Sequence, residues 1–312
     1  MGRANNTFVT EFILVGFAAI PQLQIALFVI FLTIYIFTIT TNLLIIGTVR
    51  AEQHLHKPMY FFISNFSVLE ICYTNAIIPK MMVGLVTGNK SISVQGCIIQ
   101  FYFVSDFSVT LHFLLAVMSY DRYLAICRPL HYTTIMTSRV CGYLALFAWT
   151  AGHFAPFMPA VMVSNLYFCG PQNIDHFFCD FAPLLKLSCT DTSLAEVTYF
   201  AFAWSVILCC FFFTLVSYVH IISTVLRIKS PFGRQKTFST CTSHLAVVSI
   251  YYGSVIFIYI RPTARTRFHW DKVVSVFYSM VTPVFNPIVY SLRNQEVKKA
   301  LAKVLYRHQR LG

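Results

Sequence analysis

Residues 118–127 read Met-Ser-Tyr-Asp-Arg-Tyr-Leu-Ala-Ile-Cys and close an apolar run that begins at Ile92. The acid and the arginine stand where that run ends, a position typical of the edge of a membrane span. Of the 312 residues, 57% are hydrophobic and 11% charged, whereas about 25% of a soluble domain is charged. So few charges cannot cover a soluble surface, and so apolar a chain does not stay disordered. The sequence therefore predicts a membrane protein.

The run that ends at residue 120 is one of seven apolar stretches, each with about the 20 residues that a helix needs to cross the hydrocarbon core. None alternates with the period of two expected of barrel strands. We expect an all-α membrane protein with a seven-helix transmembrane domain over 24–292, an N-terminal segment 1–23 and a tail 293–312. The predicted spans are 24–49, 58–79, 92–120, 140–163, 197–226, 237–260 and 273–292.

The basic residues predict the orientation of the bundle. If the N-terminus lies outside, the cytoplasmic segments hold 15 of the 23 lysines and arginines, as the positive-inside rule requires. The four basic residues within 261–272 oppose this trend. The net charge of +12 is therefore a feature of membrane topology, and no nucleic acid partner is expected.

Two further patterns agree with an external N-terminus. Asn5 and Asn89 begin N-glycosylation tripeptides in segments predicted to lie outside. Four cysteines also fall outside, and their even number permits complete pairing in any of three connectivities. They are Cys97, Cys169, Cys179 and Cys189.

Several motifs accompany the Asp121-Arg122 pair in a fixed order along the chain. Asn42, Glu70, Trp149 and the run Asn286-Pro287-Ile288-Val289-Tyr290 lie in spans one, two, four and seven. This set resembles the rhodopsin-like G protein-coupled receptors over essentially the whole chain. Finer stretches are similar to the vertebrate olfactory receptors of the tetrapod-type class, and they are 55–62, 120–132, 217–218, 236–245 and 283–290. The chain departs from that family pattern at Thr41, Val284-Phe285 and Leu111.

The resemblance implies a rhodopsin-like fold and an odorant receptor that activates a stimulatory, olfactory-type G protein and raises cyclic AMP. It implies a multi-pass protein of the plasma membrane in olfactory neuron cilia, with receptor-transporting chaperones as further partners and no cofactor. It also implies disulfides between Cys97 and Cys179 and between Cys169 and Cys189. The residues that would form the activation switch are Asp121, Arg122, Tyr123, Tyr218, Lys236, His244, Asn286, Pro287 and Tyr290.

The expected ligand site lies between spans three, five, six and seven. Helical periodicity from Arg122 puts Leu111 and His112 and, further out, four candidate contacts on the inward face of span three. The resemblance supplies the facing positions. This mostly apolar set suits a small, weakly polar volatile molecule held by one or two hydrogen bonds. The candidate ligand contacts are Val104, Ser105, Ser108, Val109, Phe202, Ala203, Val206, Tyr252, Val255, Ile256, Tyr259, Val276 and Ser279.

Two acids lie inside the predicted spans and are functional candidates because a buried charge is costly. Glu70 shares its depth with Asn42 and Asn286, and the resemblance implies that the three form a polar cluster, which would hold either a cation or a proton. Asp106 lies roughly 160° from Arg122 on the helical wheel, so it is expected to face a neighbouring helix. Amine receptors carry an acid where this chain has Val104, which disfavours an amine ligand.

Competing interpretations account for less of the sequence. His176, Cys179 and Asp180 have the spacing of metal ligands, but a disulfide at Cys179 would remove the thiolate. A retinal-binding pump is disfavoured because the last span has no lysine for a Schiff base. A transporter or channel with seven helices is disfavoured because the sequence shows no internal duplication, which transporters usually have. No set of candidate catalytic residues lies at one depth in the membrane, so an enzyme is not expected.

The tail carries an apolar face that suits an amphipathic helix lying on the inner leaflet. A calmodulin target is the alternative. The apolar face comprises Val297, Ala300, Leu301, Val304 and Leu305.

Overall fold

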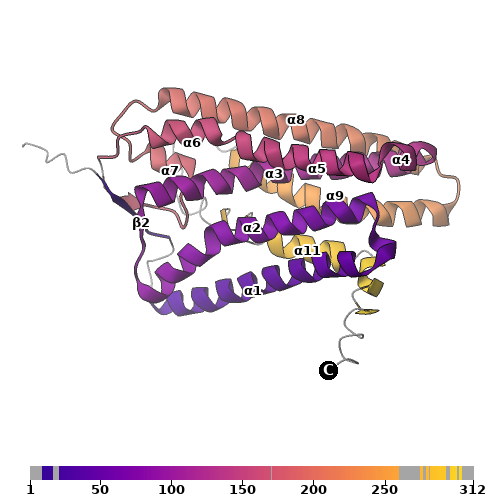
Figure 1. The fold of residues 1–312 in the computed structure, drawn as a ribbon, viewed down its shortest axis with the longest axis horizontal. Coiled ribbons are helices and arrows are strands. Elements are labelled where there is room, and N and C mark those ends of the chain that lie inside the picture. The colour runs from indigo at the N-terminus through magenta and orange to yellow at the C-terminus, as the bar shows by residue number, and fades with distance from the viewer. Residues whose placement is uncertain are drawn as a thin grey trace, which may run out of the picture.

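The computed structural model shows a bundle of long helices that lie side by side, with a small sheet at one end (Figure 1). It describes residues 9–16, 21–169, 171–259, 275–276, 279–280, 282–292, 296–300 and 302–303. We call the end that carries the sheet the sheet end, and the opposite end, where helix α4 (Pro129–Ile135) lies, the Arg122 end.

Five described helical stretches are long and apolar enough to cross a membrane. Large apolar side chains on their outer surfaces, among them Ile25, Leu146 and Phe212, are more than half exposed, as lipid-facing residues are. The stretches belong to α1 (Pro21–Ala51), α2 (Pro58–Thr87), α3 (Val94–Cys127), α5 and α6 together (Ser138–Phe154 and Phe157–Ser164), and α8 (Ser193–Leu226).

Helices α2 and α3 run past the ends predicted for their spans, and the fourth span is interrupted. Helix α2 continues beyond residue 79 with Pro79 inside it, so the lost backbone donor and the ring of this proline do not end the helix. It ends at Thr87, and the next residue, Gly88, has a φ of 70°, the left-handed conformation common after a helix. Helix α3 carries the Asp121-Arg122 pair within its last turns and ends at Cys127. The fourth span is broken into α5 and α6 at Pro156.

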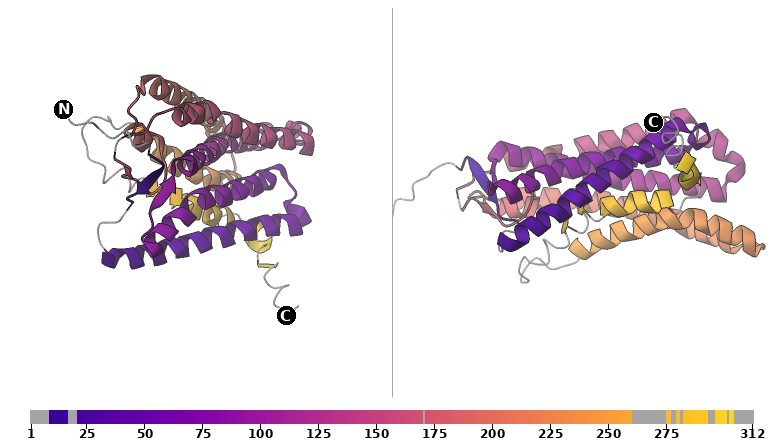
Figure 2. Two further views of the ribbon diagram at one scale, coloured as in Figure 1. Left: turned by 60° about the vertical axis from the view of Figure 1, so that its left-hand side comes forward. Right: turned by 90° about the horizontal axis from the view of Figure 1, so that it is seen from below.

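The last two helices of the bundle close its remaining side, where Figure 2 shows α9 and α11 next to one another. Helix α9 runs over Pro231–Tyr259, and α11 over Thr282–Leu292 with Pro287 inside it. The predicted seventh span began at residue 273, and its first part is described only at 275–276 and 279–280.

A three-stranded sheet that the sequence did not predict covers the sheet end. The central strand β1 (Glu11–Leu14) pairs antiparallel with β2 (Ser91–Ser93) and parallel with β3 (Asn173–Ile174). Phe12 and Leu14 point inward and are buried, and the Phe12 ring meets Phe168 edge-on with centroids 5.1 Å apart. The N-terminal segment therefore ties together two loops that are distant in sequence.

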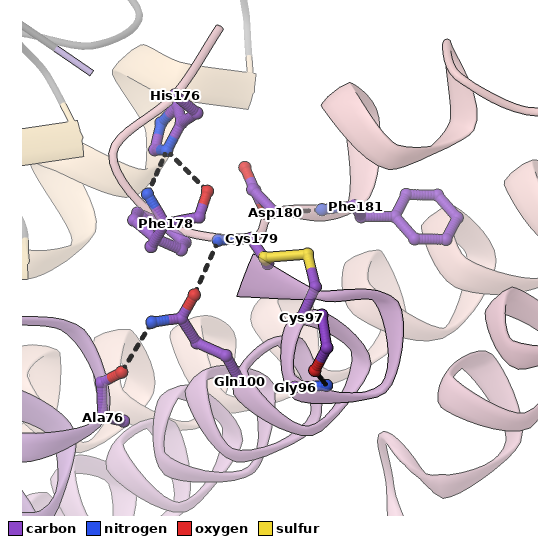
Figure 3. Close-up of a disulfide and its surroundings, with 10 residues drawn as sticks. Ala76, Gly96, Cys97, Gln100, His176, Phe178, Cys179, Asp180 and Phe181 are labelled. Atoms are coloured by element: carbon purple, nitrogen blue, oxygen red, sulfur yellow. Dashed lines mark hydrogen bonds between the residues drawn. A yellow bond between two sulfur atoms is a disulfide. The ribbon is translucent and has the colours of Figure 1, made fainter. Parts of the chain in front are cut away.

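Two disulfides hold the long loop that contains β3 and α7 (Phe181–Leu185). The structure joins Cys97 to Cys179, with Cα atoms 5.4 Å apart, and Cys169 to Cys189, with Cα atoms 5.9 Å apart. Beside the first disulfide, Gln100 accepts a hydrogen bond from the Cys179 backbone at 3.0 Å and donates one to the Ala76 carbonyl at 2.8 Å (Figure 3). The loop is thereby fastened to α3 and, through Gln100, to α2.

The tail is fastened to the Arg122 end of the bundle. Residues 296–300 and 302–303 are helical, and Val297 and Ala300 are each 1% exposed within the main hydrophobic core. Lys57 pairs with Glu296 at 2.9 Å, and Lys303 pairs with Glu52 at 2.8 Å. The apolar face predicted for the inner leaflet therefore packs, at these two residues, against the protein. Leu301, Val304 and Leu305 lie outside the described residues.

Candidate functional site

A cavity of about 170 Å³ lies between helices of the bundle, which converge on it from several sides. Helix α3 forms one wall, α8 and α9 form the facing walls, and α2 and α11 form the base. The long apolar runs bring these helices together, and inward residues of each line the space between them. A volume of this order holds one ring-sized organic molecule, since a cavity of about 150 Å³ accepts benzene.

Eight of the thirteen predicted ligand contacts line this cavity. Their positions on α3 follow the helical period stepped back from Arg122, and those on α8 face them across the cavity. The eight are Val104, Ser105, Ser108, Val109, Phe202, Ala203, Val206 and Val255.

Three other predicted contacts pack elsewhere in the part of the bundle that the structure describes. The Tyr252 ring packs against Phe211, with centroids 5.2 Å apart. Val276 joins a cluster beside Met280, and the Ser279 hydroxyl donates to the carbonyl of Ser275 at 2.5 Å. The resemblance put these three residues on the inward faces of their spans, whereas Tyr252 and Val276 pack against other side chains and Ser279 bonds to the carbonyl of its own segment. The side chains of Ile256 and Tyr259 lie outside the described residues.

The base of the cavity is polar. Glu70 is 2% exposed, and the Asn286 side-chain amide donates a hydrogen bond to its Oε1 atom. Asn42, the third member of the predicted cluster, donates to the Thr38 carbonyl of its own helix at 3.0 Å. Glu70 Oε2, Asn42 Oδ1 and Asn286 Oδ1 have no hydrogen-bond partner among the described residues. Three buried oxygen atoms without a donor suit a proton, a cation or a water molecule.

Asp106 faces away from the cavity, as the helical wheel predicts. Its Oδ2 atom lies 3.3 Å from His153 Nδ1 on α5, and its Oδ1 accepts a hydrogen bond from Thr110 at 3.3 Å. The Tyr102 hydroxyl donates to the His153 carbonyl at 2.7 Å. Asp106 therefore joins α3 to α5 and is not placed to neutralise a cationic ligand in the cavity.

At the Arg122 end, Arg122 is held by the residue before it. Its Nε and Nη2 atoms donate to Asp121 Oδ2 at 3.0 and 2.5 Å, and the Tyr132 hydroxyl donates to Oδ1 at 2.7 Å. Asp121 is fully buried. Burial, followed by the neighbouring Asp121 charge, raises the pKa of the Tyr132 phenol, so Tyr132 remains a hydrogen-bond donor at neutral pH. This arrangement keeps the guanidinium folded against its own helix.

A second contact joins α8 to α9 at the same end. The Tyr218 hydroxyl lies 2.5 Å from His244 Nδ1, and the two rings stack with centroids 5.8 Å apart. Tyr123 packs beside Tyr218 in a small apolar cluster, while Pro287 lies inside α11. The side chains of Lys236 and Tyr290, also predicted for the switch, lie outside the described residues.

Of the two predicted glycosylation positions, Asn5 lies outside the described residues. Asn89 is exposed in the segment between α2 and β2.

The structure adds cavity residues that the sequence did not predict. Asp180 and Tyr199 line the cavity, and Asp180 caps α7 by accepting a hydrogen bond from the Phe181 backbone at 2.8 Å (Figure 3). The Cys97–Cys179 disulfide brings Asp180 to this position, and its adjacency to Cys179 was the only signal in the sequence. The metal interpretation fails at Cys179, because its sulfur is bonded to Cys97 and is no longer a thiolate ligand.

Comparisons of the sequence with known proteins all find the same family. The sequence model described as "Olfactory receptor" matches residues 31–308. The chain is 48% identical over 301 residues to Olfactory receptor-like protein OLF1 of Canis lupus familiaris, covering 96% of this chain and 97% of that one. It is 47% identical to Olfactory receptor 5I1 of Homo sapiens, covering 96% of each chain, and 48% identical to Olfactory receptor 6F1 of Homo sapiens, covering 97% of this chain and 98% of that one.

Proposed function

The chain belongs to the olfactory receptor family, and from this premise we propose that it binds a small, weakly polar odorant in the cavity between α3, α8 and α9. It is a multi-pass membrane protein with the seven-helix bundle of that family. The sheet end faces the outside and the Arg122 end the cytoplasm. The observation that carries the proposal is the cavity itself, which is ring-sized and lined by eight of the predicted ligand contacts.

Binding acts by shifting an equilibrium between two arrangements of the bundle. In the arrangement described, Asp121 holds Arg122, and Tyr218 is held by His244. An odorant that contacts both α3 and α9 favours the arrangement in which both helices contact it. It shifts the equilibrium only by the difference between its affinities for the two arrangements. Movement of α9 at the Arg122 end then separates Tyr218 from His244 and frees Arg122 for the G protein.

The intracellular partner is a heterotrimeric G protein of the stimulatory, olfactory type, and its activation raises cyclic AMP. Support comes from family membership and from the side chains at the Arg122 end that the family uses for coupling. We also assign the protein to the plasma membrane of olfactory cilia, with receptor-transporting chaperones assisting its delivery. No enzymatic step is part of this function.

The cavity proposal is tested by filling the cavity from one wall. Ala203 lines the cavity, so Ala203→Phe should displace the odorant and lower the potency of every activating odorant by more than about tenfold. Ala201 lies two residues earlier on α8 and is exposed, so Ala201→Phe is the matched control. A cyclic AMP reporter, normalised to surface receptor, measures both variants. Equal loss in the two variants, or no loss in Ala203→Phe, would contradict this location of the site.

A further inference from the structure

One polar position in the wall of the cavity has no role in the proposed switch. His112 on α3 and Tyr251 on α9 both line the cavity and are 5% and 6% exposed. Their rings meet edge-on with centroids 5.0 Å apart. Around them the cavity wall is apolar on α8, where Phe202, Ala203 and Val206 stand. A polar group in such surroundings decides which ligand orientation is favourable.

The hydrogen bonds of His112 define which ring nitrogen carries the proton. Nδ1 lies 2.7 Å from the carbonyl oxygen of Ser108, which can only accept a hydrogen bond. Nδ1 is therefore the protonated nitrogen. None of the ion pairs formed by the described residues includes His112, so its buried ring is neutral. Nε2 then carries a lone pair and acts as an acceptor.

The surrounding hydroxyls leave that acceptor weakly engaged. The Tyr251 hydroxyl lies 3.2 Å from Nδ1 and 3.4 Å from Nε2, and the second distance is beyond the usual range of a strong O–H···N bond. The Ser108 hydroxyl donates its proton to the Val104 carbonyl at 2.8 Å, so its oxygen also offers only lone pairs to a ligand. The wall formed by His112 and Ser108 is thus rich in acceptors and poor in donors.

We propose that His112 makes the receptor selective for small molecules that carry a hydrogen-bond donor, namely ring-sized alcohols and phenols. The ligand hydroxyl donates to His112 Nε2 while its ring fills the apolar part of the cavity. This inference rests on the proposed odorant site and specifies its ligand class. A ketone or hydrocarbon of the same shape leaves the acceptors unpaired, and the loss of one such neutral hydrogen bond lowers affinity by about three- to tenfold.

Matched ligands test the inference through binding. Purified full-length receptor in lipid nanodiscs is heated with cyclohexanol, methylcyclohexane or cyclohexanone, which have nearly the same size. The wild-type receptor should be stabilised by cyclohexanol at a concentration about three- to tenfold lower than is needed for the other two. His112→Phe, which keeps a ring but removes the acceptor, should abolish that preference. His112→Gln, which restores an acceptor, should recover it.

Comparing compounds within each variant cancels differences in folding and expression. Equal stabilisation by the three compounds in the wild type, or an alcohol preference that survives His112→Phe, would overturn the inference. Nitrogen-15 spectra of histidine-labelled receptor, assigned with His112→Phe, should show a proton on Nδ1; a proton on Nε2 would also overturn it. An alcohol-selective shift without any cyclic AMP response would instead count against the proposed function, so the two failures are distinguishable.

Discussion

Gly152 marks the closest approach of α5 to α3, and its replacement by alanine should separate the two helices. A Cβ atom at Gly152 would lie 1.8 Å from Thr110 Oγ1 and 2.9 Å from the carbonyl oxygen of Asp106. Ordinary van der Waals contact begins at about 3.4 Å. The Thr110 hydroxyl can rotate away, but the backbone oxygen cannot, so the helices must move apart by several tenths of an ångström.

The magnitude follows from two opposing effects. Overpacking of a tight contact costs about 1–3 kcal/mol, and Gly→Ala in a helix gains about 1 kcal/mol. Because both short contacts are far below normal separation, we expect Gly152→Ala to lower the free energy of unfolding by about 1–2 kcal/mol. It also disturbs the hydrogen bond from Thr110 to Asp106. Close approach through small residues is a general means of packing helices in membranes.

Gly142 provides a control on the same helix. A Cβ atom there meets nothing within 4 Å, so Gly142→Ala should show the helix gain alone. Thermal unfolding of both variants in nanodiscs should differ by about 5–10 °C, at about 2–4 °C for each kcal/mol. If Gly152→Ala were as stable as Gly142→Ala, the described approach of α3 and α5 would be wrong.

Two further predictions concern the ends of the bundle. The hydrogen bond from Lys57 lowers the pKa of the Glu296 carboxyl, and burial raises it. The effect of Lys57 is the larger, so this pKa lies below its usual value near 4.5. A depressed carboxyl pKa adds stability above the unfolded-state pKa that is lost as pH falls through the folded value, so Glu296→Gln should flatten the decline in melting temperature below about pH 4.5. The effect should stay under about 1 kcal/mol because the pair is half exposed; an unchanged decline refutes it. At the sheet end, Phe12→Ala removes a fully buried ring and should cost about 3–5 kcal/mol locally, which hydrogen exchange at residues 11–14 and 91–93 would detect as faster exchange. Protection equal to that of the wild type would show that β1 does not depend on Phe12.

The sequence predicted the helical bundle because its main signals are local. Apolar runs of membrane length identify spans regardless of their neighbours, and the helical period relates residues on one helix. That period correctly turned Asp106 away from the cavity, where it meets His153. It also placed four α3 residues at the cavity wall, relative to Arg122.

Features that depend on contacts between distant segments were not predictable in the same way. The β1 strand has only four residues, and its partners lie in two loops far along the chain. The burial of Val297 and Ala300 against the core and the entry of Asp180 into the cavity depend on which surfaces meet. A strand or apolar face of this length has no sequence signal of its own strong enough to identify its partner.

The sequence by itself determined a membrane-embedded helical bundle, its family and the inward face of α3, because hydrophobic length, periodicity and short motifs are properties of single segments. Only the tertiary structure decided what those faces meet. It put the Ser108 carbonyl 2.7 Å from His112 Nδ1, which assigns the proton to that nitrogen, and it placed the Tyr251 hydroxyl beside the ring. The direction of a hydrogen bond depends on the positions of both partners, and residue identity alone does not supply them.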